Sequence, residues 1–315
     1  MKTKALARRW CWLLLPMLLL FAGCADKKKQ AADLLESARN NLAKGNNDAA
    51  LADCSKAIEL TPDDSQAYIK RSVVKFAKSD FAGAITDCSK AISLQPNDFS
   101  AYMMRASAEE AKADAVHALA DWTQAIALHP IPEGYSQRGR LRHLTGDFSG
   151  AIDDYEKAQS EPDFLLRLRR YVLLRRLGRD PGSLDQTNAP VSAPWLRTIA
   201  HYLTGQMNEA DFLTAADQGS PTDVAAQQCQ AYYFIGEMHL INHDPAGARK
   251  FFSQSAALNE TEADEYEFAR AELTLLDKPP ATVPGQSASP ALNSLIDNSP
   301  YGENYGPGPT PPPAQ

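Results

Sequence analysis

The feature that most constrains this 315-residue chain is a motif of about 34 residues that recurs four times between residues 31 and 162. The run Cys-Ser-Lys-Ala-Ile at residues 54–58 is repeated at residues 88–92, and related runs follow twice more. Alanines recur at equivalent places and a proline closes each copy: Ala50, Ala84, Ala118 and Ala151; Ala57, Ala91, Ala125 and Ala158; Pro62, Pro96, Pro130 and Pro162. A period of this length is typical of stacked supersecondary units that bury their apolar faces against one another.

Small residues and prolines predict the geometry of each unit. Proline cannot continue a helix, so each proline ends the second helix of its copy. Small residues allow two helices to cross closely, and the first helix offers one in each copy: Ala38, Ser72, Ala106 and Gly139. Larger residues are expected to fill the gaps toward the next unit: Cys54, Cys88, Trp122 and Tyr155. The sequence therefore predicts an all-α solenoid of antiparallel helical hairpins.

This pattern resembles the tetratricopeptide repeat family over residues 31–162, where four clear units are predicted. The resemblance implies a right-handed superhelix and protein binding on the inner surface formed by the first helix of each unit. Beyond Pro162 the copies decay, and residues 163–228 are expected to form degenerate helical pairs. Residues 229–277 are expected to form a last unit and a capping helix, which covers the final apolar face.

Residues 1–23 have the pattern of an export signal. A basic segment is followed by an apolar run of about a dozen residues, which is too short to span roughly 30 Å of hydrocarbon. Leu-Phe-Ala-Gly at residues 20–23 precedes Cys24 and resembles the lipobox of bacterial lipoproteins. The resemblance implies cleavage before Cys24, palmitate-type acylation of Cys24, and a lipidated tether over residues 24–30. The alternative is an ordinary secretory peptide.

The location within the cell envelope follows from the residue after the lipidated cysteine. Ala25, rather than aspartate, follows Cys24. By resemblance to the enterobacterial sorting rule, this favours an outer-membrane anchor that faces the periplasm. The inner membrane and the cell surface are alternatives.

Net charge and the number of cysteines argue against a nucleic-acid-binding protein and against a fold held together by disulfides. Without residues 1–23 the chain keeps 28 basic and 39 acidic residues, a net charge of −11, which argues against nucleic-acid binding. Three cysteines then remain besides Cys24, and an odd number argues against a disulfide framework, so we expect buried thiols. Residues 278–315 are rich in proline and glycine and are predicted to be disordered.

No arrangement of residues typical of catalysis stands out, and we predict a non-enzymatic protein without a cofactor or metal. His239 and His243 have the spacing of helical metal ligands, but Asp244-Pro245 ends the helix there, so a hairpin corner explains both histidines. The alternative from another functional class is an enzyme whose site is hidden in residues 163–228.

One candidate site is the inner surface of the first helices, which we call the helix-A surface. By register it consists of Leu35, Arg39, Leu42, Gln66, Ile69, Val73, Phe76, Ser100, Met103, Ser107, Glu110, Glu133, Ser136, Arg140 and His143. Leu35 and Ile69 stand where the family's carboxylate clamp needs polar donors, so that activity is not implied. The alternative is that this surface is merely solvated and another face binds partners.

A second candidate is a basic patch in an otherwise acidic chain, formed by Arg142, Arg167, Arg169, Arg175 and Arg176. Guanidinium groups pair well with carboxylates, so the patch can receive an acidic segment. The alternative is pairing of these arginines within the chain.

A regular charge pattern also runs through the repeats. The second helix carries Asp53, Asp87, Asp121 and Asp154, and the following unit carries Arg71, Arg105, Arg138 and Arg170. Pairing each aspartate with the arginine of the next unit leaves no group over, so we expect an inter-repeat ladder of Asp53–Arg71, Asp87–Arg105, Asp121–Arg138 and Asp154–Arg170 that fixes the stacking register.

Three segments near the C-terminus resemble one particular group of tetratricopeptide repeat proteins. Residues 229–236, 248–252 and 265–273 look like the end of the "new lipoprotein I" family of outer-membrane tetratricopeptide lipoproteins. That resemblance implies a homodimeric adaptor that brings cell-wall hydrolases and a processing protease together. The alternative within the binding class is a pilus or secretion assembly lipoprotein.

Overall fold

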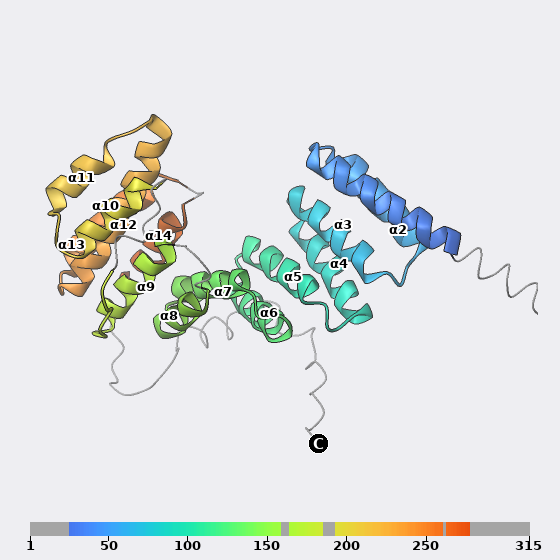
Figure 1. Ribbon diagram of the computed structural model, residues 1–315, viewed down its shortest axis with the longest axis horizontal. Coiled ribbons are helices and arrows are strands. Elements are labelled where there is room, and N and C mark those ends of the chain that lie inside the picture. Colours follow the sequence, from blue (N-terminus) through green and yellow to red (C-terminus); the bar gives the residue numbers. More distant parts are fainter. Residues whose placement is uncertain (1–24, 159–163, 185–192, 261–262, 278–315) are drawn as a thin grey trace, which may run out of the picture. The chain divides into compact units, whose positions relative to one another are not determined.

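The computed structural model describes residues 25–158, 164–184, 193–260 and 263–277. The predicted signal peptide, Cys24 and the predicted tail over 278–315 lie outside these residues. The described residues are helical with connecting turns and contain no strand, which confirms the predicted all-α hairpin solenoid (Figure 1). Among them, no helix combines the length and the apolar character needed to cross a membrane.

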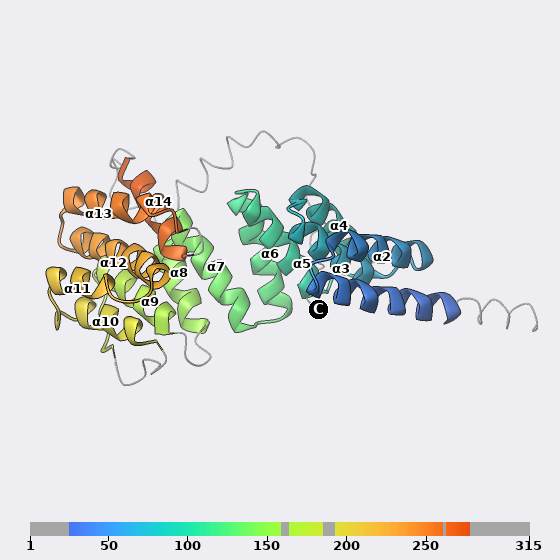
Figure 2. The same cartoon turned by 90° about the horizontal axis from the view of Figure 1, so that it is seen from above.

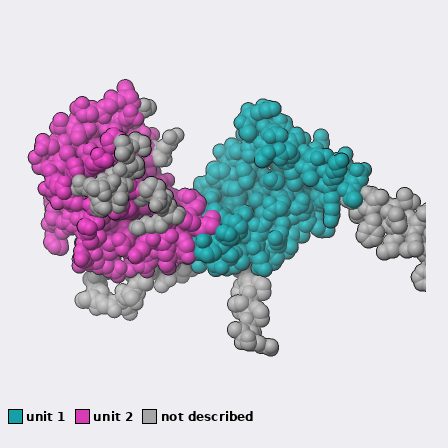
Figure 3. Space-filling view, in the orientation of Figure 1, with its two compact units in different colours: residues 1–130 teal, residues 131–315 magenta. Residues whose placement is uncertain are grey.

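Contacts between residues divide the chain into two compact units, residues 1–130 and 131–315 (Figure 3). In the first unit, a helix over residues 25–43 pairs with α2 (Asn47–Leu60), α3 (Ser65–Ala77) pairs with α4 (Phe81–Leu94), and α5 (Phe99–Ala111) pairs with α6 (Ala115–Leu128) (Figure 2). Aspartates cap most of these helices; Asp80, for example, accepts a hydrogen bond from the backbone N–H of Gly83.

The second unit begins with the fourth hairpin, α7 (Pro132–Thr145) and α8 (Phe148–Lys157). It continues with α9 (Phe164–Arg176) and the short helices α10 (Pro194–Leu203) and α11 (Glu209–Ala216). The last hairpin is α12 (Pro221–Ile241) and α13 (Pro245–Ala257), followed by α14 (Asp264–Asp277). Helix α12 is longer than the pattern suggests, because Ser220 and Asp223 form a capping box that starts it eight residues before position 229.

The small residues lie where the helices of each hairpin cross, as predicted. On the first helices, Ala38, Ser72 and Ala106 are buried. On the second helices, the four equivalent alanines are fully buried: Ala50, Ala84, Ala118 and Ala151. A Cβ atom added at Gly139 would lie 2.9 Å from the ring of Tyr155, so only glycine fits there without displacement. Steric fit at these crossings therefore sets the spacing within each hairpin.

The N-terminal segment is helical. Residues 25–30 continue directly into the first hairpin, whereas Cys24, the predicted site of acylation, lies outside the described residues. Ala25 and Asp26, followed by lysines, glutamine and alanine, favour helix and place an acidic residue at its positive end.

Candidate functional site

The aspartates of the second helices are bound within their own hairpins. Arg71 donates from Nε and Nη2 to the two carboxylate oxygens of Asp87 at 2.8 and 2.7 Å. Arg105 binds Asp121 in the same way at 2.5 and 2.8 Å, and Arg138 binds Asp154 at 2.8 and 2.7 Å. In every pair the aspartate follows the arginine by 16 residues. The predicted ladder between successive repeats is therefore wrong.

The prediction of an inter-repeat ladder assumed that every aspartate needs an arginine. A neutral hydrogen-bond donor can take the place of that arginine. In the first hairpin Asp53 accepts hydrogen bonds from Ser37 Oγ at 2.8 Å and Asn41 Nδ2 at 3.0 Å, so it needs no arginine. At the other end of the series, Arg170 pairs with Glu156 at 3.2 Å. Asp53 is therefore satisfied within its own hairpin, and Arg170 of α9 is bound by Glu156 of the preceding α8, so neither group requires an aspartate–arginine pair between repeats.

A second donor reaches most of these aspartates from one helical turn further along the first helix. Asn41 supplies it in the first hairpin, Lys75 binds Asp87 at 2.8 Å, and Arg142 binds Asp154 at 2.8 Å. The third hairpin has Glu109 at this position, facing Asp121 and 4.0 Å from Arg105 Nε. The Oε2 atom of Glu109 is buried without a hydrogen-bond partner among the described residues. Burial, and then the charge of Asp121, raise the pKa of Glu109 to about 8.

The helix-A surface of residues 25–130 is partly exposed and mixed in chemistry. Leu35 and Ile69 are 7% and 8% exposed and pack in the core, so their assignment to a ligand-contacting surface is wrong. Val73 is 37% exposed, and among the described residues only Leu177, at 41%, is also classed as an exposed large apolar side chain. The other predicted members in this unit are exposed or half-buried: Arg39, Leu42, Gln66, Phe76, Ser100, Met103, Ser107 and Glu110.

Some of these side chains are held by their neighbours. Gln66 donates to Asp98 at 2.6 Å, and Glu110 accepts a hydrogen bond from Trp122 Nε1 at 2.5 Å. The ring of Phe76 packs edge-on against Phe81 with centroids 5.2 Å apart. These contacts fix Gln66, Glu110 and Phe76 against their neighbours, whereas Val73 on α3 is exposed.

In residues 131–277 the corresponding surface is covered by the chain itself. Helix α14 contacts α7 and α12, and Arg140 of α7 binds Glu267 of α14 at 2.8 Å. His143 is 2% exposed and its ring stacks on Phe268 at 4.1 Å. Glu133 and Ser136 lie at the uncovered start of α7. The assignment of Arg140 and His143 to an open surface is therefore wrong, because α14 already occupies it.

Four of the five arginines of the basic patch bind acceptors within the chain. Arg169 binds Glu265 and Asp264 at 2.7 and 2.8 Å, and Arg176 binds Glu272 at 2.6 Å. Arg142 is engaged by Asp154, and Arg175 donates to the backbone oxygen of Leu203 at 3.1 Å. Arg167 lies over the ring of Phe164. The interpretation of this patch as a free basic surface is thus wrong, although Arg169 and Arg176 do receive an acidic segment, namely α14.

His143, Glu237 and Glu272 bring three potential metal ligands within 4.8 Å of one another. Arg176 lies among them, binding Glu272 and also Glu237 at 3.2 Å. Burial lowers the pKa of His143 well below its usual value, so the ring is neutral, and burial raises the pKa of Glu237. A guanidinium group already supplies the positive charge, and this cluster is better described as a buried ion-pair network than as a metal site.

The remaining candidates have structural roles. Cys54, Cys88 and Cys229 are free and buried, as expected, and burial raises the pKa of each thiol to about 11. His243 lies at a hairpin corner with φ of 60°, and His239 Nδ1 lies 2.8 Å from Asp244.

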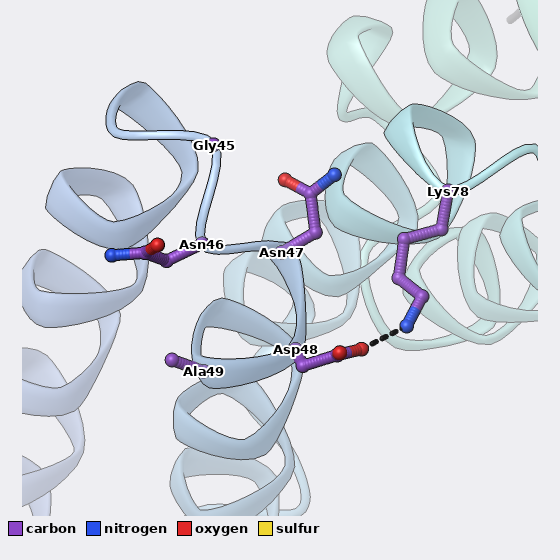
Figure 4. Close-up of a pocket in the computed structure, with 6 residues that line it drawn as sticks. All are labelled: Gly45, Asn46, Asn47, Asp48, Ala49 and Lys78. Atoms are coloured by element: carbon purple, nitrogen blue, oxygen red, sulfur yellow. Dashed lines mark hydrogen bonds and ion pairs between the residues drawn. The ribbon is translucent and has the colours of Figure 1, made fainter.

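A shallow hollow at the start of α2 is lined by Gly45, Asn46, Asn47, Asp48, Ala49 and Lys78 (Figure 4). Its main feature is the ion pair between Lys78 and Asp48, which links two hairpins.

Comparison with known proteins agrees with the fold. No curated protein matches the chain. A solved tetratricopeptide repeat protein from Parabacteroides merdae is 16% identical, with a TM-score of 0.50 over 79% of this chain and 100% of that one. PilF from Pseudomonas aeruginosa is 15% identical, with a TM-score of 0.48 over 78% of this chain and 99% of that one. The first tetratricopeptide domain of Spaghetti (RPAP3), bound to an HSP90 peptide, is 22% identical with a TM-score of 0.37 over 38% and 95%.

The family comparison is confined to the N-terminal hairpins. The tetratricopeptide repeat family matches residues 35–99, the part of the chain in which the sequence period is clearest. The chain thus matches the tetratricopeptide repeat pattern over residues 35–99, and its described helices have the fold of antiparallel helical hairpins seen in the Parabacteroides protein.

Proposed function

We propose that this protein is a lipid-anchored scaffold of the bacterial envelope that binds segments of other proteins on the helix-A surface of residues 25–130. The anchor is Cys24 and the protein faces the periplasm from the outer membrane. The pattern at residues 1–24 supports the anchor, and the hairpin fold supports the role in protein binding.

The observation that carries the binding surface is the exposure of Val73. It stands 37% exposed on α3, while Phe76 and Met103 lie half-buried on α3 and α5 in the same register. Isolated exposed apolar residues are common, but one that shares a surface with an aromatic ring and a methionine can make contacts that exclude water. Gln66, Ser100 and Ser107 supply hydrogen-bonding groups around this centre. Such a surface suits a partner segment with alternating apolar and polar side chains.

The partners we propose are envelope enzymes, namely cell-wall hydrolases and a processing protease, and the resemblance of residues 229–273 to the "new lipoprotein I" family is their support. A homodimer is part of the same proposal. A role in pilus assembly remains an alternative, since the lipid anchor and the repeats suit it equally.

Site-specific photocrosslinking in the native host tests the surface. A photoreactive residue placed at Val73 or at Met103 is expected to capture partner proteins, which mass spectrometry then identifies. The same residue at Lys90, an exposed position on α4, serves as the matched control. Capture of the same proteins with equal yield from Lys90 would show that the binding surface lies elsewhere.

A further inference from the structure

Helix α14 lies against the second unit in the way that a helical ligand lies in a groove. Its buried face is formed by Glu265, Phe268, Ala269 and Glu272, which are all 0–1% exposed. Their spacing of three, four and seven residues places them on one side of the helix. Glu267, Arg270 and Thr274 on the other side are exposed. The same pattern of anchors is used by amphipathic helices that bind hydrophobic grooves of other proteins.

Two glutamates form the ends of this buried face. Glu265 accepts hydrogen bonds from Nε and Nη2 of Arg169 at 3.0 and 2.7 Å. Glu272 accepts from Nη1 and Nη2 of Arg176 at 2.6 and 2.9 Å. Both arginines are on α9 and both glutamates on α14, seven residues apart in each helix. The match of two arginines to two glutamates fixes the position of α14 along α9.

An aromatic anchor fills the space between the two ion pairs. Phe268 is fully buried, its ring stacks on that of His143 from α7, and it lies 5.8 Å from the ring of Tyr233 on α12. The guanidinium carbon of Arg169 lies 5.1 Å from the centre of the Phe268 ring. Three side chains of α14, Glu265, Phe268 and Glu272, therefore make its specific contacts with the groove. Their partners lie on α7, α9 and α12.

The nature of these contacts makes α14 replaceable. The attraction within a buried ion pair is largely offset by the cost of desolvating both charges, so the pairs give positional specificity more than net stability. Helix α14 is the last helix of the described residues, and among them it is joined to its neighbours through its N-terminal end only. Segments at the edge of a fold open at lower free energy than the core. A partner helix with the same anchors can make the same contacts.

We propose that α7, α9 and α12 form a helix-binding groove, that α14 occupies it as an internal ligand, and that an acidic amphipathic helix of a partner protein with Glu, Phe and Glu at the spacing of Glu265, Phe268 and Glu272 takes its place. This site is separate from the helix-A surface of residues 25–130, and its ligand is a helix.

A labelled peptide with the sequence of residues 263–277 tests the groove by fluorescence anisotropy with the full chain. The variant Phe268→Ala weakens the internal helix and leaves the groove unchanged, so it is expected to bind the peptide at least tenfold more tightly than the unmodified chain. A peptide with lysine in place of both glutamates is expected not to bind. Failure of folded Phe268→Ala protein to bind the peptide would overturn the proposal.

Hydrogen exchange of the unmodified chain gives a second test that needs no variant. The amides of α14 are expected to exchange faster than the central amides of α9 and α12, and excess unlabelled peptide is expected to speed their exchange further. Exchange of all three helices at one common rate would show that α14 is an inseparable part of the core. Crosslinking at Val73 is independent of both outcomes.

Discussion

Asp53 and Asp154 occupy equivalent positions in the first and fourth hairpins but depend on different donors. Asp154 is fully buried and is bound by Arg138 and Arg142, both charged. Asp53 is only half-buried and is bound by Ser37 and Asn41, both neutral. The energetic role of one sequence position therefore depends on what surrounds it.

We expect Asp154→Ala to destabilise the protein by about 3–5 kcal/mol, since it leaves the buried guanidinium of Arg138 without its counter-charge. The matched variant Asp53→Ala is expected to cost at most about 1 kcal/mol, because two neutral donors are released into partly exposed surroundings. Urea unfolding followed by circular dichroism measures both. If both variants lost the same free energy of unfolding, the different roles of charge and burial at Asp154 and Asp53 would be contradicted.

Glu109 occupies the position at which the other hairpins have a second hydrogen-bond donor to the aspartate. We expect it to make the free energy of unfolding depend on pH. Its pKa is about 8 in the folded protein, against a reference value of 4.5. Between these values the folded state holds a proton that the unfolded state has lost, so stability falls as pH rises from about 4.5 to about 8 and then levels off.

Glu109→Gln is expected to remove this dependence and to raise stability above pH 8 by roughly 1–3 kcal/mol, the usual cost of a buried polar group without a partner. The difference between the variant and the unmodified chain, measured by urea unfolding at pH 5 and pH 9, isolates Glu109 from other titrating groups. Trp122 in the same hairpin provides a fluorescence signal. A difference that does not change with pH would refute the prediction.

At the scale of helices, packing within hairpins depends on the small residues at the crossings. Ala84 on α4 is fully buried beside the first helix of its hairpin, whereas Thr86 on the same helix is exposed. Substitutions at these two positions therefore distinguish two causes of destabilisation. A large side chain can disturb the helix crossing, or it can disturb α4 wherever it is placed.

Ala84→Phe is expected to overpack the crossing and destabilise the protein by at least about 1–3 kcal/mol. Thr86→Phe adds a similar ring on the exposed side of α4 and is expected to change stability by less than about 0.5 kcal/mol. Thermal unfolding compares the two. A melting temperature that Ala84→Phe leaves unchanged would mean that the register of the repeats is wrong.

At the scale of the whole molecule, the proposed anchor joins a helical repeat to the membrane without an extended spacer. The six steps from residue 25 to residue 31 rise about 1.5 Å each in a helix, or roughly 9 Å in total, where an extended chain would reach about 20 Å. In the proposed anchored state, the first hairpin then lies close to the lipid head groups, and Lys27, Lys28 and Lys29 are within reach of the phosphates.

Cys24→Ser is expected to release the protein from membranes, since each buried methylene of an acyl chain contributes about 0.8 kcal/mol and several chains are needed for firm anchoring. Labelling cells with radioactive palmitate and separating membranes from soluble protein measures the effect. Cys54→Ser, which removes a buried thiol instead, is the control and is expected to leave labelling unchanged. Acylation of the Cys24→Ser variant would contradict the proposal.

The sequence by itself determined the hairpins, their crossings and the buried thiols. These features depend on local patterns: a proline ends a helix, and a small residue recurring every 34 positions marks the same crossing each time. Contacts between neighbouring helices of one hairpin are nearly fixed by such a pattern, because the connecting turn is short. The same logic explains why Ala84 and Gly139 were assigned correctly from spacing alone.

Only the tertiary structure decided how the charges pair and which surfaces stay open. Asp87 has arginines in both its own and the next hairpin, and spacing does not choose between them; antiparallel packing does, because it brings Arg71 across from it. Arg176 and Glu272 are 96 residues apart, so nothing local joins them. The seven-residue spacing of the two arginines and the two glutamates was visible in the sequence, but it became informative only once α14 was seen to fold back on α9, because burial of charge depends on contacts between distant helices.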